Sequence, residues 1–122
     1  MENSSSISPV CYDIPEDADS IGAVQDGDRA FLFGFKTRRE VFAQLGYLTI
    51  PGDDKNLSAC AKAMCDLLRM TAIIKAITIT QDDLLGSLNE EDRNAPFAKR
   101  NAAMVLTAVH QAVTKYASEK KQ

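Results

Sequence analysis

The sequence predicts an α+β fold, because a strand hairpin comes first and helices follow it. Aromatic residues alternate with smaller ones in residues 29–35, which predicts a strand. Apolar residues recur at helical spacing in residues 56–69 and again beyond Asn94, which predicts two amphipathic helices. No internal repeat interrupts this order.

The predicted hairpin consists of two strands and a polar turn. Phe31, Phe33 and Phe35 alternate at a period of two, so all three can face one core. Charged residues at 36–40 predict the turn, and residues 41–47 predict the returning strand. A Pro-Gly-Asp-Asp sequence then interrupts regular structure.

The clearest predicted helix covers residues 56–69, where apolar side chains form one stripe on a 3.6-residue period. The stripe consists of Leu57, Cys60, Ala61, Met64, Leu67 and Leu68. Polar side chains such as Lys62 and Asp66 cover the opposite side. Residues 71–77 are apolar but short, and periodicity leaves their type open.

Two capping signals predict the remaining helices. Thr80 is followed three residues later by Asp83, which predicts a short helix that ends near Leu88. Asn94 predicts the start of the long final helix, and Pro96 fits its first turn because a missing N–H costs nothing there.

A length of 122 residues fits one domain. Residues 1–9 are rich in serine and are expected to be disordered, and residues 10–28 are expected to form an extended, loop-like lead-in. We therefore divide the chain into a disordered or extended N-terminal segment at 1–13, a single domain at 14–118 and a polar tail at 119–122.

Composition argues against several classes of protein. The net charge of -3 and the scattered basic residues argue against a nucleic-acid partner. The longest apolar runs fall short of the roughly 20 residues that a membrane span needs, so no membrane partner is expected. The N-terminus lacks a signal-peptide pattern, and three cysteines without a framework spacing suggest reduced thiols. These features predict a cytoplasmic protein.

Most catalytic motifs are absent from the sequence, which contains no Gly-rich phosphate loop, HExxH or CxxC. His110 is expected on the flank of the final helix, partly exposed. Cys60 and Cys65 lie five residues apart on one helix, so they cannot bind one metal from the same face. Both are expected to be structural and largely buried. The acidic residues 16–19 lack calcium-loop spacing and predict a solvated loop.

A whole-chain resemblance is more informative than any one motif. Segments spread along the chain carry it: 14–22 (IPEDADSIG), Gly27-Asp28, 42–47 (FAQLGY), 57–61 (LSACA), 76–84 (AITITQDDL) and 108–116 (AVHQAVTKY). Together they resemble the IscU/NifU family of iron–sulfur cluster scaffolds, whose wider superfamily includes SufE-type sulfur acceptors. The resemblance implies a three-stranded antiparallel sheet with helices packed on one face.

The family holds a cluster or zinc with cysteines and an aspartate or histidine, and the resemblance maps this ligand pocket onto five positions. They are Asp26, Asp28, Tyr47, Arg100 and Asn101. Only the aspartate survives, as Asp28, and no ligand position carries a cysteine. An iron–sulfur cluster or zinc is expected only if the cysteines align differently, with Asp28, Cys60 or Cys65 as ligands.

The resemblance implies three possible functions, and neither of the first two is enzymatic. The chain is expected to be a scaffold with a degenerate metal site, or a protein-interaction module that retains only the fold. A SufE-like sulfur acceptor that uses a cysteine persulfide is the third, and it needs an exposed thiolate with a lowered pKa. The expected partner is a cysteine desulfurase or another iron–sulfur assembly protein.

Overall fold

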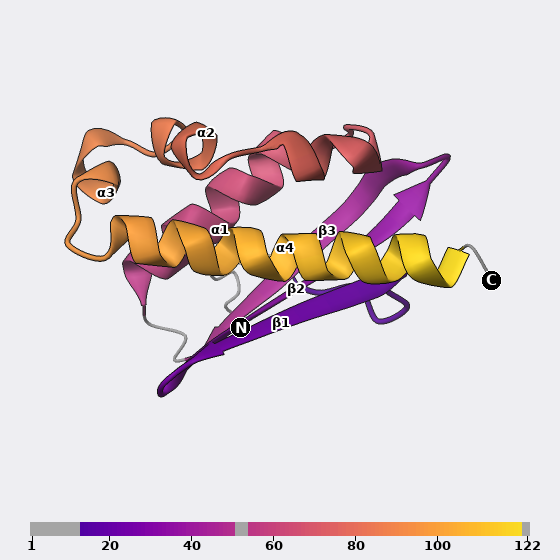
Figure 1. Ribbon diagram of the computed structural model, residues 1–122, viewed down its shortest axis with the longest axis horizontal. Helices are drawn as coiled ribbons and strands as arrows, with labels where there is room; N and C mark the ends of the chain where they lie inside the picture. Colours follow the sequence, from indigo (N-terminus) through magenta and orange to yellow (C-terminus); the bar gives the residue numbers. More distant parts are fainter. Residues whose placement is uncertain (1–12, 51–53, 121–122) are drawn as a thin grey trace, which may run out of the picture.

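The computed structural model describes residues 13–50 and 54–120, which form an α+β fold with a three-stranded antiparallel sheet, as predicted. The elements in order are β1 (Ser20–Asp26), β2 (Arg29–Arg38), β3 (Val41–Ile50), α1 (Lys55–Leu68), the 3₁₀ helix η1 (Ile73–Thr78), α2 (Gln81–Gly86), α3 (Glu90–Arg93) and α4 (Ala98–Lys120). Figure 1 shows α4 lying along β1, with α1 and α2 on the same side of the sheet.

The sheet has the order β1-β2-β3, and its helix-facing side is aromatic. Phe31, Phe33 and Phe35 are all buried on this side, which confirms the prediction from their alternation. Phe35 meets Phe42 edge-on at 5.0 Å between ring centroids, and Tyr116 of α4 in the same way at 5.6 Å. The second of these pairs packs the final helix against the sheet.

The prediction of a loop-like lead-in at residues 10–28 is wrong for its second half. Residues 20–26 form β1, which pairs with β2 from Ser20–Phe35 to Asp26–Arg29. In the sequence, Gly22 suggests an interruption of regular structure. In the fold, its lack of a side chain lets α4 pack closely against β1. A Cβ at Gly22 would collide with the backbone of Ala108 in α4.

The hairpin has longer strands and a tighter turn than predicted. Instead of a turn over residues 36–40, β2 continues to Arg38, and only Arg39 and Glu40 connect it to β3. Both have positive φ angles, 56° and 63°, which is the backbone of a two-residue turn with the right-handed twist of the strands. Such turns ordinarily use Asn and Gly, so a pair of charged residues gives no turn signal of this length.

The helix starts are partly as predicted. Asp54 caps α1 by accepting a hydrogen bond from the Leu57 amide, and Thr80 forms the predicted capping box with Asp83. The predicted role of Asn94 is wrong, because Asn94 ends α3 instead of starting the final helix. Asn89 caps α3, since its side chain accepts from the Asp92 amide at 2.8 Å, and the final helix α4 begins only at Ala98.

Two other boundaries differ from the sequence-based expectations. The helix α2 ends at Gly86, before the predicted end near Leu88. Residues 73–78, which overlap the segment 71–77 whose type the periodicity left open, form the 3₁₀ helix η1. The final helix continues to Lys120, so it includes the first two residues of the tail predicted at 119–122. Of the N-terminal segment predicted at 1–13, only residue 13 lies within the described part of the chain.

Residues 13–19 cross the outer face of the sheet, away from the helices. Gly34 and Gly46 make this crossing possible, because a Cβ at either position would collide with Ile14 or with the backbone of Asp13. Asp19 fixes the end of the crossing, since its carboxylate accepts from the amide of Thr37 at 2.7 Å. Among the described residues, no helix is both long and apolar enough to cross a membrane.

Candidate functional site

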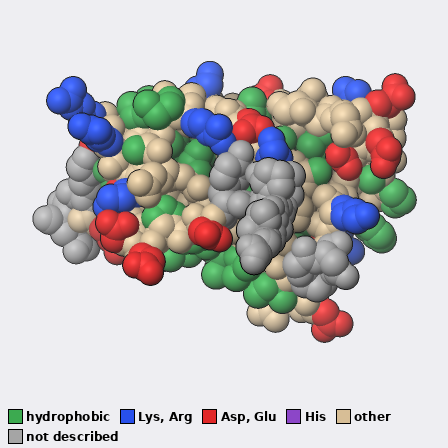
Figure 2. All heavy atoms as spheres, turned by 180° about the vertical axis from the view of Figure 1, so that it is seen from behind, with side chains coloured by type: hydrophobic (Ala, Val, Ile, Leu, Met, Phe, Trp, Pro, Cys, Tyr) green, Lys and Arg blue, Asp and Glu red, His purple; other side chains and the backbone are tan. Residues whose placement is uncertain are grey.

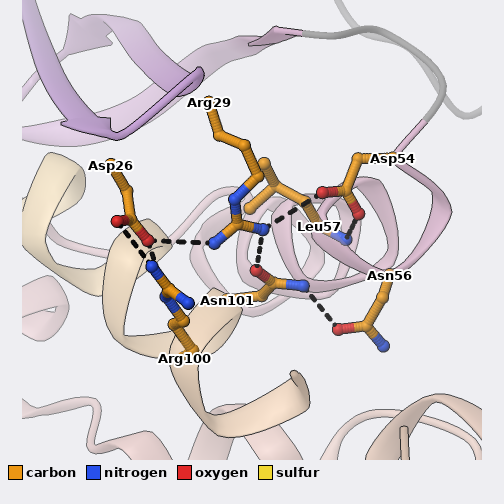
Figure 3. Close-up of polar contacts among 7 residues, drawn as sticks. All are labelled: Asp26, Arg29, Asp54, Asn56, Leu57, Arg100 and Asn101. Atoms are coloured by element: carbon orange, nitrogen blue, oxygen red, sulfur yellow. Dashed lines mark hydrogen bonds and ion pairs between the residues drawn. The ribbon is translucent and has the colours of Figure 1, made fainter. Parts of the chain in front are cut away.

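The positions mapped to a ligand pocket contain a network centred on the guanidinium of Arg29 (Figure 3). Arg29 Nη1 donates to Asp54 Oδ2 at 3.1 Å and to Asn101 Oδ1 at 2.6 Å. Its Nη2 donates to Asp26 Oδ2 at 3.1 Å. One part-buried guanidinium therefore joins the end of β1, the start of α1 and the first turn of α4.

Arg100 completes the exposed side of the network. Its Nε and Nη2 donate to the two oxygens of Asp26, both at 2.7 Å, which is a bidentate ion pair. Asp26 thus lies between two guanidinium groups, as Figure 3 shows. The Arg100 side chain is 58% exposed and that of Arg29 only 21%, so Arg29 is the more buried of the two arginines.

Asn101 forms the buried side of the network, where it is only 1% exposed. Its Oδ1 accepts from Arg29, and its Nδ2 donates to Asn56 Oδ1 at 2.8 Å. Asn56 in turn donates to the carbonyl oxygen of Asp92 at 3.0 Å. The amide of Asn101 is therefore satisfied on both sides, as a buried polar group requires.

The two arginines hold the pKa of Asp26 at about 2, below its ordinary value of 3.8. The hydrogen bonds from Arg100 contribute most to this shift, and those from Arg29 come next. A carboxyl group with a depressed pKa contributes stability above its unfolded value and loses it as the pH falls through its folded value. The contribution of Asp26 is therefore lost between pH 3.8 and about 2.

We predict that Asp26→Asn lowers stability at neutral pH and removes this part of the acid dependence. The wild type is then more stable than the variant at pH 7, and the difference shrinks as the pH falls toward 2. Urea unfolding of both proteins over this pH range measures the difference. A gap that stays constant with pH contradicts the assignment.

The other two mapped positions do not join the network. Asp28 is exposed in the turn between β1 and β2, after Gly27. Tyr47 lies on β3 with 5% of its surface exposed, and its ring stacks on Phe31 with 6.1 Å between centroids. The structure therefore brings together Asp26, Arg100 and Asn101, and leaves Asp28 and Tyr47 outside.

The donor set of this pocket does not fit an iron–sulfur cluster or a zinc ion. Clusters and structural zinc need thiolates or imidazoles, whereas the network offers carboxylate and amide oxygens that already bind a guanidinium. Within residues 13–50 and 54–120, no group of three or more His, Cys, Asp or Glu side chains could hold a metal ion.

The cysteines of α1 lie in the hydrophobic core. Cys60 is fully buried and Cys65 is 1% exposed. Burial is the main cause that raises the pKa of each thiol to about 12, with a further rise at Cys60 from the charges of Asp92 and Asp54. Neither thiol has the exposure or the low pKa that a sulfur acceptor needs. Cys11 lies outside the described residues.

His110 lies on the flank of α4, half-buried as predicted. Its Nε2 is buried and has no hydrogen-bond partner among the described residues. The acidic residues 16–19 are mostly exposed, and Asp17 forms an ion pair of 2.9 Å with Lys36. The hydrogen bond to the carboxylate of Asp17 raises the pKa of Lys36. The ion pair connects the segment before β1 with strand β2.

Sequence reasoning missed Arg29 and Asp54, the two residues that give the network its centre. Arg29 appears in the sequence only as the first residue of a strand, and Asp54 as part of a Pro-Gly-Asp-Asp interruption. A local signal was available for Asp54 alone, because an aspartate directly before a predicted helix commonly caps that helix.

Comparisons with known proteins leave the family resemblance as a hypothesis. No protein-family model matches the chain, and the search of curated proteins finds no match.

Proposed function

We propose that this chain is a non-catalytic protein-binding module, related in fold to the iron–sulfur scaffolds and without their cluster chemistry. The position of Arg29 carries this proposal. A guanidinium lies among the side chains at the mapped ligand positions and binds the carboxylates of Asp26 and Asp54. A positive side chain at the centre of the site repels a metal cation and already satisfies the oxygen donors.

The network also has a structural role that suits such a module. It ties β1, β2, α1 and α4 together at one end of the molecule, through side chains that are mostly part-buried. Rigid elements held in this way keep a binding surface in a fixed shape, which lowers the entropy lost on association. Function in this proposal resides in the surface and needs no reactive group in the pocket.

A cysteine desulfurase is the first partner to test, because the sequence resembles proteins of iron–sulfur assembly. We expect the purified chain to bind a purified desulfurase with the same affinity in the presence and absence of EDTA, as measured by isothermal titration calorimetry. Metal-independent binding is the expected result because no metal takes part. Loss of binding on chelation contradicts the proposal, and no binding in either condition removes the desulfurase as the partner.

A further inference from the structure

A groove of about 810 Å³ opens beside the turn between β2 and β3 and carries an excess of positive charge. Its lining includes Lys36, Arg38, Arg39, Val41, Gln44 and Met70. No Asp or Glu of the described part of the chain lines it. Figure 2 shows Lys and Arg side chains beside hydrophobic ones toward this end of the molecule, at the left.

The strand register places the cations on one face. Lys36 and Arg38 are two residues apart on β2, so both point away from the core where Phe35 lies. A bulge between Lys36 and Thr37 leaves Ala43 of β3 without a partner and bends the hairpin here. The lining of the groove therefore combines the apolar side chains of Val41, Ala43 and Met70 with three basic side chains.

Most of this positive charge has no counter-charge. Lys36 pairs with Asp17 at 2.9 Å, but Arg38 and Arg39 are exposed and have no ion-pair partner among the described residues. Arg39 also holds a left-handed backbone, with φ at 56°, where Asn or Gly is favoured. The net charge of the whole chain is -3, so this groove runs against the overall balance.

Met70 places a large apolar side chain at the same groove. It is 70% exposed, and its φ angle of 61° is in the left-handed region that non-glycine residues rarely adopt. The backbone is held there by a hydrogen bond of 3.1 Å from the Met70 amide to the carbonyl oxygen of Phe42. An exposed, flexible thioether is a common contact at surfaces that bind varied apolar side chains.

We infer that this groove binds an acidic segment of a partner protein, with carboxylates on Arg38 and Arg39 and one apolar side chain against Met70 and Val41. The inference rests on the proposal that the chain binds a partner protein. Charge complementarity favours an acidic occupant, and the apolar lining residues favour a polypeptide over a bare phosphate chain. Among the described residues that line the groove, there is no aromatic side chain on which nucleic-acid bases could stack.

The test uses a short synthetic peptide in which glutamates flank one leucine, titrated into the isotopically labelled full chain. We expect amide shift changes at residues 36–44 and at Met70. A peptide with glutamine in place of glutamate, and one with serine in place of leucine, should each bind about tenfold more weakly. Equal binding of all three peptides, or shifts centred elsewhere, overturns the inference.

Matched variants separate the groove from net charge. We expect Arg38→Glu combined with Arg39→Glu to weaken peptide binding at least about tenfold, and Lys75→Glu combined with Lys115→Glu, which changes the net charge equally, to have little effect. Met70→Asn removes the apolar contact and suits a positive φ, so it should weaken binding without loss of folding. Equal losses in both double variants overturn the inference.

Other occupants are distinguished in the same titration. Saturable binding of oligothymidylate or of phosphatidylserine vesicles at residues 36–44, in preference to the acidic peptide, replaces the protein segment with another anionic partner and overturns the inference. Failure of peptide binding while a desulfurase still binds removes only the groove and leaves the proposed function. Failure of desulfurase binding while the acidic peptide still binds removes the desulfurase as the partner and leaves the groove.

Discussion

Replacing Arg29 with methionine is expected to lower the free energy of unfolding by about 2 to 3 kcal/mol, because it removes the shared donor of a part-buried network. The change leaves Oδ1 of Asn101 without its partner in a site that is only 1% exposed. It also leaves the carboxylate of Asp54, which is 20% exposed, without its ion pair. Urea unfolding at neutral pH measures the loss.

Arg100→Met is the matched control, since Arg100 binds the same aspartate from the exposed side. Arg100 is 58% exposed and contacts only Asp26 within the network, so its loss should be clearly smaller than that of Arg29. Equal losses for the two variants would show that the ion pair with Asp26, and not the buried contact with Asn101, dominates the network.

Replacing Gly22 with valine is expected to destabilise the protein by about 3 kcal/mol. A side chain at this position would collide with the carbonyl oxygen of Ala108 and would also approach the Ala112 amide to 2.9 Å. Because α4 is held to β1 here by the hydrogen bond from Ser20 to the Ala112 carbonyl, the helix cannot move away without breaking it. Thermal or urea unfolding measures the effect.

Gly86→Ala is the control for this glycine. Gly86 ends α2, and a Cβ built there meets no atom within 4 Å. Alanine should therefore raise the free energy of unfolding by about 0.5 to 1 kcal/mol, through the lower entropy of the unfolded chain. A loss of stability in Gly86→Ala, or none in Gly22→Val, would contradict the assigned packing.

Local periodicity was enough to predict the elements that build the core. The alternation of Phe31, Phe33 and Phe35 gave the correct face of β2, and the apolar stripe of residues 57–68 gave the buried face of α1. The first strand was missed because Gly22 resembles a breaker until α4 is placed against it. The prediction for Asn94 was wrong because residues 90–93 form a separate short helix that Asn94 ends, and the final helix begins only at Ala98.

The site was only partly predictable. The resemblance selected Asp26, Arg100 and Asn101. Asp26 binds Arg100 directly, but Asn101 joins them only through Arg29, which also binds Asp54. These two residues are 25 positions apart, and their contact depends on how β2 lies beside the start of α1. No local sequence pattern encodes this contact, because it depends on tertiary packing.

Metal and acid-labile sulfide analysis tests most directly whether Arg29 has replaced a metal in this pocket. The protein is purified without oxygen, offered iron, sulfide and zinc, and desalted, beside a scaffold that carries three ligand cysteines as the positive control. We predict that the control retains iron and sulfide and that this chain retains neither metal nor sulfide. Iron and sulfide bound in proportion to the chain would contradict the proposal and would place Cys60 or Cys65 in a rearranged cluster site.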